Sequence, residues 1–365
     1  MSKMKRLICN TKFCLDSFGD GGSRRSVQIR SFLTDNDIAY EEDSFSLSKG
    51  VSIGNLIQWS FRAIIFIRKY YPLKIKGFSS FIKLVKYYAL RIPVVYDKYK
   101  NQEVVFLWEN TTDNNMLYLM RATGNRVIGL PHNVESLVVN GSAGALASEV
   151  DNLKLCDAVF AISKEETWLL RLLGVRADYF PYYPVKENAS FLLSVRKKRE
   201  GKHTGHNKRF LLLGSATNYP TRIGMQSLLD YFGKVSLSFQ LYVAGYGTES
   251  LLIPNTANII FQGAISNDIL FSDLCEIDAI LVYQPPTSGA LTRIIEMLVA
   301  GIPVFVNFDG ARNYFNMDGV IVYYSFEHLY TMLCSCLFST VMAPAKESWP
   351  EGRFLTLLES FITSE

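Results

Sequence analysis

The sequence predicts an α/β protein built from two Rossmann-like domains, and three observations support this class. The chain has 365 residues, more than the roughly 250 to 300 at which a single core usually stops growing. Its composition of 48% hydrophobic, 13% aromatic and 20% charged residues is typical of a globular protein. Short apolar runs alternate with longer amphipathic segments, and a charged stretch separates two such sets.

The expected strands are runs of β-branched and aromatic residues, each followed by a polar or glycine-containing loop. Apolar runs of this length that alternate with helical segments are typical of buried parallel strands. They comprise residues 6–11, 104–109, 126–130, 158–162 and 178–182 in the first half, and 209–214, 239–245, 258–263, 279–284, 303–307 and 320–324 in the second. Each half therefore predicts one parallel sheet.

The expected domain boundary lies in the charged stretch between Val195 and Arg209. It presents no apolar face, so we favour a solvated linker or loop over a phosphate-binding arm. His203 and His206 fall within it, and their spacing alone does not indicate a metal site. The expected division is 1–195, 196–345, and 346–365, the last packing back towards the first domain.

Charge and cysteine content exclude several classes of function. The net charge of +4 is mild and its positive part is local, so we expect no nucleic-acid partner. The six cysteines include no CxxC pair, and we expect no metal site. The start lacks the apolar region of a signal peptide. These features predict a cytoplasmic protein.

Residues 56–92 combine Trp59, several Phe and Tyr, and repeated Lys and Arg. No window of about 18 residues is free of charge, so the segment is not expected to span a membrane. Two interpretations remain open. One is an interfacial surface that docks on anionic lipid headgroups, which would make the protein peripheral on the membrane. The other is a pair of ordinary amphipathic helices that cover the sheet.

The most informative stretch is TSGALTRIIEMLVAGIPVFVN, residues 287–307. It follows an expected strand and predicts a turn and then a helix over Leu291–Val299, at the sheet edge where α/β proteins bind ligands. The N–H groups of Gly289, Ala290 and Leu291, with the positive end of the helix dipole, would bind a phosphate. Arg293 would add charge and Thr292 a hydroxyl.

Glu296 lies one helical turn further on, where it would accept hydrogen bonds from sugar or ribose hydroxyls. This order of residues suits a diphosphate joined to a hydroxyl-rich group, which is a sugar nucleotide.

At this stretch the sequence resembles GT-B fold glycosyltransferases, particularly the retaining family 4 type, whose two Rossmann-like domains have parallel sheets facing across a cleft. The resemblance covers most of the chain outside residues 40–100. The matching positions of this stretch are Gly289, Arg293, Glu296, Ala300, Gly301, Pro303 and Val304. Ser288 stands where the family has its first Glu, which leaves the usual donor-sugar contact open.

Further segments agree with the resemblance in order. FLLLGSATNYPTRIG resembles the first strand, loop and helix of the donor domain, and IIFQGAISND a later strand end beside the nucleobase. They add Gly214, Ser215, Asn218, Arg222 and Gly263 to the expected donor site. VIGLPHNVES resembles the His-Asn-x-Glu strand end of the acceptor domain.

The resemblance implies catalytic roles for His132 and Glu135. His132 would hydrogen-bond the transferred sugar, while Glu135 would either orient the acceptor hydroxyl or cap a helix. Gly21 and Gly22 would form a loop that closes over the donor phosphates. A plain turn, followed by a helix that Ser23 caps, fits as well.

The predicted function is transfer of a sugar from a UDP- or GDP-linked donor to a glycan or lipid-linked acceptor, in bacterial surface polysaccharide or glycoconjugate synthesis. The resemblance implies retention, with no metal and no other cofactor. The absence of Gly-x-Gly-x-x-Gly gives hydride transfer little support. Two alternatives are a non-catalytic partner of a glycan assembly complex and a sugar-nucleotide epimerase.

Overall fold

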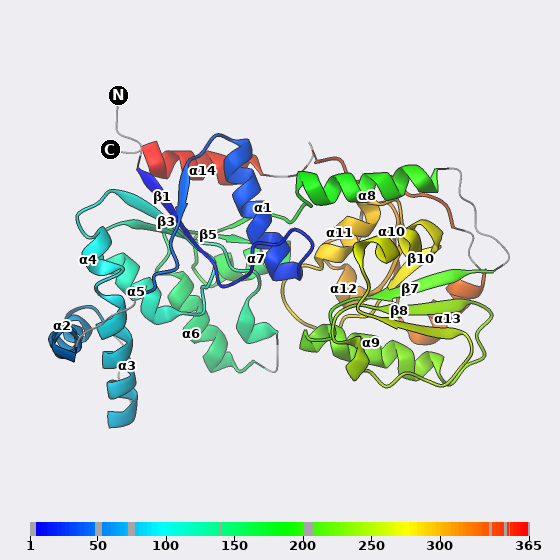
Figure 1. Ribbon diagram of the computed structural model, residues 1–365, viewed down its shortest axis with the longest axis horizontal. Helices are drawn as coiled ribbons and strands as arrows, with labels where there is room; N and C mark the ends of the chain where they lie inside the picture. The colour runs from blue at the N-terminus through cyan, green and yellow to red at the C-terminus, as the bar shows by residue number, and fades with distance from the viewer. Residues whose placement is uncertain are drawn as a thin grey trace.

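The computed structural model describes residues 5–47, 53–71, 77–138, 141–200, 207–335, 338–346, 349 and 351–363. It contains two six-stranded parallel sheets, each with helices on both faces (Figure 1). The predicted class, α/β with two Rossmann-like domains, is confirmed.

The first sheet has the strand order β2-β1-β3-β4-β5-β6, and every neighbouring pair is parallel. Five strands coincide with predicted runs, whereas β2 was not predicted. The bounds are β1 Arg6–Asn10, β2 Tyr40–Glu42, β3 Val104–Trp108, β4 Arg126–Gly129, β5 Ala158–Ala161 and β6 Ala177–Tyr179. Because the chain runs outward in both directions from β1 and β3, the loops after these two strands diverge and leave a crevice at the carboxyl edge.

The second sheet has the order β12-β11-β10-β7-β8-β9, also parallel throughout. All six strands lie in predicted runs. Their bounds are β7 Arg209–Leu213, β8 Gln240–Ala244, β9 Ile259–Gly263, β10 Ala279–Val282, β11 Val304–Asn307 and β12 Val320–Tyr323. Here the order reverses between β7 and β10, so the second crevice lies between the loops after these strands.

The helices cover both faces of each sheet. In the amino-terminal part they are α1 Gly21–Asp35, α2 Ile53–Tyr70, α3 Phe78–Arg91, α4 Tyr96–Tyr99, α5 Asn114–Ala122, α6 Ala143–Leu153 and α7 Lys164–Leu172, with a 3-10 turn at Glu135–Leu137. The rest are α8 Lys186–Arg199, α9 Tyr219–Phe232, α10 Asn267–Glu276, α11 Thr292–Val299, α12 Phe308–Ala311, α13 Phe326–Ser335 and α14 Gly352–Thr363, with a 3-10 turn at Thr248–Ser250. No helix among the described residues is long and apolar enough to cross a membrane.

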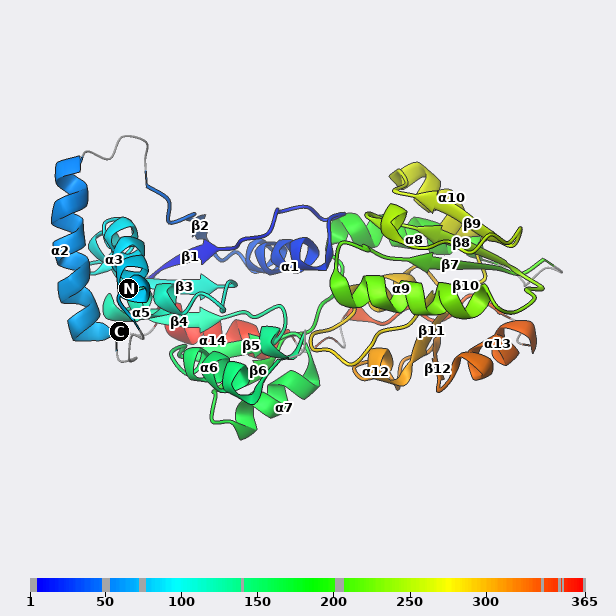
Figure 2. The same ribbon diagram turned by 90° about the horizontal axis from the view of Figure 1, so that it is seen from below.

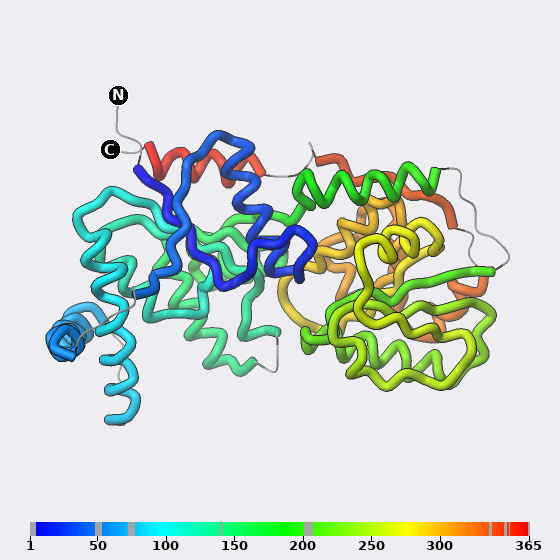
Figure 3. The backbone as a smooth tube through the Cα atoms, viewed as in Figure 1, coloured from blue at the N-terminus to red at the C-terminus, as the bar shows by residue number. Residues whose placement is uncertain are grey.

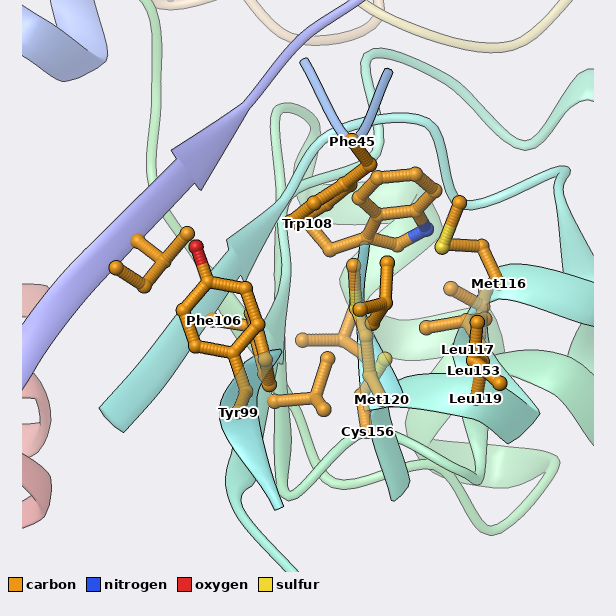
Figure 4. Close-up of a cluster of buried hydrophobic side chains, with 14 of the residues drawn as sticks. Phe45, Tyr99, Phe106, Trp108, Met116, Leu117, Leu119, Met120, Leu153 and Cys156 are labelled. Carbon is orange, nitrogen blue, oxygen red and sulfur yellow. The ribbon is translucent and has the colours of Figure 1, made fainter. Parts of the chain in front are cut away.

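Alternate side chains of each strand enter the cores on the two faces of its sheet, as the two-residue period of a strand requires. In the first sheet α1 and α14 pack on one face, and α5, α6 and α7 on the other. Figure 4 shows Phe106 and Trp108 of β3 among Phe45, Tyr99 and Met116 in the second of these cores. In the second sheet α8, α10 and α11 cover one face, and α9 and α13 the other.

The predicted solvated linker is wrong for the first part of the charged stretch, because residues 196–199 form the last turn of α8. Arg199 is buried and donates to the carbonyl oxygens of Leu274 and Ile277 at 2.8 and 2.6 Å. Arg196 donates to the Val299 carbonyl at 2.8 Å. These side chains satisfy backbone oxygens at the ends of α10 and α11, which a charge pattern alone does not reveal. The stretch 201–206, with both histidines, lies outside the described residues.

Figure 3 traces the chain passing from the first domain to the second before α8. α14 returns to the first domain, where Phe354 packs between Phe32, Phe160 and Phe180. The predicted boundary at residue 195 falls inside α8, which packs on the second domain.

Candidate functional site

The carboxyl edges of the two sheets meet, so that their crevices face each other. Ser288, after β10, donates through Oγ to the carbonyl oxygen of Val134, after β4, at 2.7 Å. The first residue of α1, Gly21, abuts α11, because a Cβ there would lie 3.5 Å from Oγ1 of Thr292. Figure 2 shows α1 between the two sheets. Two helix N-termini, each a partial positive charge, therefore converge at one place.

A turn and then α11 follow β10, in the order that the sequence predicted. Gly289 has φ of +82°, which favours glycine. The residue before the helix, Leu291, provides no side-chain cap. The N–H groups of Ala290, Leu291 and Thr292 form no hydrogen bond with another described part of the chain. They are available to an anion, since the first N–H groups of a helix have no intrahelical partner.

Gly289 differs from its neighbours because its N–H has a partner. It donates to Oε1 of Glu166 on α7 at 2.9 Å, and the same oxygen accepts the N–H of Val134 at 2.8 Å. Glu166 is buried, and burial raises the pKa of its carboxyl group. The carbonyl oxygen of Gly289 accepts from Arg312 at 2.6 Å.

Arg293 lies in the crevice of the second sheet. It donates to the carbonyl oxygen of Leu213 at 3.0 Å and contacts Oε1 of Gln284 at 3.4 Å. It forms no ion pair with any carboxylate in the described ranges, and its Nε has no hydrogen-bond partner there. Burial lowers the pKa of its guanidinium to about 10. A half-buried cation without a counter-ion among the described residues is costly and favours a site for an anion.

Glu296 lies on the same helix and is buried. Its carboxylate accepts from the Tyr182 hydroxyl at 2.7 Å and from Nδ2 of Asn188 at 3.0 Å, and it forms an ion pair with Arg24 of α1. A carboxylate has about four acceptor positions, and three are used. One acceptor position has no partner among the described residues, and the predicted hydrogen bond from a ribose or sugar hydroxyl would need such a position.

His132 and Glu109 form a buried pair at the crevice of the first sheet. Nε2 of His132 lies 2.9 Å from Oε2 of Glu109. Ser26 also donates to Oε2, and Arg30 forms an ion pair with Oε1. Phe13, from the loop after β1, stacks on the imidazole with ring centroids 4.3 Å apart.

The protonation of this pair follows from its surroundings. Burial lowers the pKa of His132, although Glu109 opposes the shift. Burial alone would raise the pKa of Glu109. The hydrogen bond from His132 and the charge of Arg30 outweigh the effect of burial, so this pKa is lowered. The imidazole is therefore neutral, with Nε2–H donating to the carboxylate. Nδ1 is left as an acceptor, buried and without a partner in the described chain.

The other predicted residues are placed less centrally. Glu135 is exposed at a 3-10 turn, with its N–H bound to Glu149 at 2.9 Å. Gly21 and Gly22 form the first turn of α1, not a loop, and Asp20 caps that helix in place of Ser23, because its carboxylate accepts the Ser23 N–H at 2.8 Å.

In the second domain, Gly214 lies against Arg293, since a Cβ there would lie 2.5 Å from Nη1. Ser215 binds Thr217 at 2.6 Å and Asn218 caps α9, so both are in the loop after β7. Arg222 is exposed and lies over the ring of Tyr219, and Gly263 ends β9, two strands away from β7.

Sequence reasoning missed Glu109, Glu166, Tyr182 and Asn188. Glu109 directly follows a buried strand, and a polar residue at a strand's carboxyl end is a signal that could have found it. Nothing local indicates the others. Among the described residues no group of three or more His, Cys, Asp and Glu side chains could hold a metal ion.

Comparisons with known proteins agree on the fold. No protein-family model matches the sequence, and no curated protein matches it. Among solved structures, TarM aligns over 99% of both chains at 9% identity, with a TM-score of 0.63. HepE from Anabaena, solved with UDP-glucose, aligns over 91% of this chain and 89% of its own at 10% identity, with a TM-score of 0.59.

Sucrose-phosphate synthase from Thermosynechococcus elongatus aligns over 91% of this chain and 90% of its own at 12% identity, with a TM-score of 0.54. These neighbours are GT-B glycosyltransferases, and at such identities their likeness establishes the fold alone. The chain has the GT-B fold, as predicted.

Proposed function

We propose that this protein is a glycosyltransferase that moves a sugar from a UDP- or GDP-linked donor to a glycan or lipid-linked acceptor. The observation that carries the proposal is Arg293, half-buried and without a carboxylate partner in the described chain, beside N–H groups at the start of α11 that bind no other described residue. An arginine and a helix N-terminus together bind a diphosphate. The GT-B fold shared with HepE, solved with UDP-glucose, supports the same class.

In this proposal each domain supplies one half of the chemistry. Arg293 and the α11 dipole stabilise the charge that develops on the leaving diphosphate, so the reaction needs no metal. Glu296 accepts a hydrogen bond from the ribose. Nδ1 of His132 accepts one from a hydroxyl of the transferred sugar, because the Glu109 contact directs the imidazole proton to Nε2.

The stereochemistry and setting follow from the resemblance to family 4 enzymes. We propose retention by front-face attack, with the leaving phosphate taking the acceptor proton, and a role in bacterial surface polysaccharide or glycoconjugate synthesis. The protein would work in the cytoplasm, peripheral on the membrane.

Thermal stabilisation by a panel of UDP-, GDP-, TDP- and CMP-sugars tests the donor site. A ligand that binds only the folded protein raises its melting temperature by mass action. We expect one nucleotide class to do so in the wild type and in the control Lys198→Met, which changes an exposed cation on α8. Arg293→Met should weaken that binding by about 30- to 150-fold, since a charge-assisted hydrogen bond contributes about 2 to 3 kcal/mol.

The same panel separates the alternatives. No stabilisation by any nucleotide sugar would favour a non-catalytic partner of a glycan assembly complex. Ser288, at the position where family 4 enzymes have a Glu, is compatible with that alternative. Equal binding by wild type and Arg293→Met would place the donor elsewhere. Where a nucleotide sugar binds, a second assay distinguishes transfer from epimerisation. A transferase releases the nucleoside diphosphate only when an acceptor is present.

A further inference from the structure

Helix α2 is apolar on two opposite faces, but only one of them is covered. Ala63, Phe66 and Ile67 are buried against the rest of the domain. The other face carries Ile53, Ile57, Phe61 and Ile65, which are 80%, 56%, 67% and 66% exposed. At 3.6 residues per turn these four side chains span an arc of about 120°. Large apolar side chains along one face of a helix are normally covered, and no described residue covers this face.

The neighbouring helix also exposes apolar side chains. α3 packs against α2 and exposes Phe78 and Ile82, one turn apart, at 77% and 51%. Figures 1 and 2 show the two helices at the end of the amino-terminal domain farthest from the second domain. We call these residues the α2–α3 surface: Ile53, Ile57, Phe61, Ile65, Phe78 and Ile82. Soluble proteins seldom expose this many large apolar side chains on two neighbouring helices unless something binds them.

The charge around this surface has one sign. Between Asp43 and Asp97 the sequence has no acidic residue and nine basic ones. Among the described residues of this stretch, Arg62 binds Asp97, and Arg91 binds the Phe45 carbonyl oxygen. The exposed cations of α2 and α3 are Arg68, Lys69, Lys83 and Lys86. The binding partner must therefore be apolar and anionic.

An anionic lipid bilayer fits this apolar and basic surface better than a second copy of the chain does. A second copy docking through the same surface would bring unbalanced cations together, and like charges across an interface oppose association. An anionic phospholipid bilayer offers both an apolar layer and phosphates at its boundary. The length of α2 and its Arg62, Arg68 and Lys69 suit a helix that lies in the interface rather than one that crosses the membrane.

We infer that the α2–α3 surface docks this protein on an anionic phospholipid bilayer. The apolar side chains enter the boundary between headgroups and acyl chains, and the lysine and arginine side chains contact lipid phosphates. The second domain then points away from the bilayer. This inference does not depend on the nucleotide-sugar site, which lies at the opposite end of the first domain.

Vesicle co-sedimentation of the full chain tests the inference. We expect binding to vesicles of phosphatidylcholine with about one third phosphatidylglycerol, little binding to phosphatidylcholine alone, and release at high salt. Lys83→Gln with Lys86→Gln should lower the apparent affinity by about 30-fold, since each cation near an anionic surface contributes about fivefold. The matched control, Lys197→Gln with Lys198→Gln on α8, should bind as the wild type does.

Ile57→Ser with Phe61→Ser should abolish binding, whereas the apolar control Leu172→Ser, an 85% exposed side chain on α7, should not. Both substituted positions are exposed, so folding is preserved, and unchanged nucleotide-sugar binding would confirm it. Equal vesicle binding by wild type and the Ile57/Phe61 variant would overturn the inference. So would a dimer of the wild type in lipid-free solution that this variant converts to a monomer.

Discussion

The carboxylate of Glu166, in the amino-terminal domain, accepts the backbone N–H of Gly289, in the carboxyl-terminal domain, at 2.9 Å. Gly289 belongs to the turn expected to bind the donor phosphate. The hydrogen bond joins the two sheets, but it also places a carboxylate where the proposed ligand is an anion. The same turn therefore contacts a carboxylate that joins the domains and, in the proposal, an anionic diphosphate. The carboxylate would repel that ligand.

We expect Glu166→Gln to raise the affinity for the nucleotide sugar by about tenfold. The amide oxygen still accepts the N–H groups of Gly289 and Val134, while the charge that repels the diphosphate is removed. Two like unit charges about 10 Å apart repel each other by a free energy that corresponds to about this factor in affinity, at an effective dielectric constant near 20. Isothermal titration calorimetry measures the change.

Asp151→Asn is the control for this experiment, because it removes an exposed carboxylate from α6 in the same domain. It should leave the affinity unchanged. A lower affinity in Glu166→Gln than in the wild type would show that the carboxylate orders the turn for the donor, contrary to the prediction.

The second prediction concerns the tautomer of His132. In Glu109→Gln the side-chain amide can donate to Nε2, which moves the imidazole proton to Nδ1 and removes the acceptor there. We expect the transfer rate to fall by about 100-fold or more, with nucleotide-sugar affinity changed less than about threefold. Steady-state kinetics with separate kcat and KM values checks this.

Ser26→Ala provides the matched comparison. It removes another hydrogen bond to Glu109 but keeps the carboxylate and therefore the tautomer. It should cost about 1 kcal/mol of stability and leave kcat near that of the wild type. If both variants lower kcat equally, the loss arises from disturbed packing and not from the imidazole.

The third prediction concerns the pH dependence of stability. Because the folded pKa of His132 lies below its ordinary value of 6.5, the unfolded chain binds the proton more readily. The contribution of a neutral His132 is fully present above pH 6.5 and is lost as pH falls below it. The difference in free energy of unfolding between wild type and His132→Gln should therefore be largest at pH 8 and shrink towards pH 5.

Urea denaturation at several pH values measures this difference. His328→Gln is the control, since His328 is exposed on α13. Its difference from the wild type should vary much less with pH. A difference for His132→Gln that grows towards acid would show that the folded protein protonates the imidazole.

The fourth prediction concerns Gly214. Its backbone conformation is open to other residues, but an added Cβ would lie 2.5 Å from Nη1 of Arg293 and 2.7 Å from Cγ2 of Thr221. In Gly214→Ala the flexible arginine must move away from the crevice between β7 and β10. We expect nucleotide-sugar affinity to fall at least tenfold with about 1 to 3 kcal/mol of destabilisation, measured by calorimetry and thermal melting.

Gly22→Ala tests whether such an effect is specific to the crevice. There a Cβ would lie 2.3 Å from the ring of Phe13, which stacks on His132. This variant should disturb the imidazole and lower kcat more than donor affinity. Unchanged donor affinity in Gly214→Ala would mean that Arg293 is not a donor ligand.

The strands could be predicted because each is a buried apolar run that ends in a polar or glycine-containing loop. β2 escaped prediction because its three residues, Tyr40–Glu42, are an edge segment that is only partly covered and has no apolar run. The start of α11 was predictable for a similar reason, since Gly289, Thr292 and Arg293 are adjacent in the chain.

The remainder of the site depends on contacts that no local pattern encodes. Glu109 and His132 are 23 residues apart and come together because β3 and β4 are neighbours. Glu166 and Gly289 meet across 123 residues. A charged residue can also be buried where the sequence predicts a solvated one. Arg199 belongs to a charged run, yet its side chain donates to carbonyl oxygens inside the second domain.

The last prediction separates two roles of Glu296. Its ion pair with Arg24 joins residues 272 positions apart and links α1 to α11. Breaking a buried pair leaves an uncompensated charge, so Arg24→Met and Glu296→Gln should each cost about 1 to 3 kcal/mol, and the double variant less than their sum. If the fourth acceptor position of Glu296 binds ribose, only Glu296→Gln lowers nucleotide-sugar affinity, by about tenfold. Calorimetry on the three variants decides, because a purely structural Glu296 would change stability in each and affinity in none.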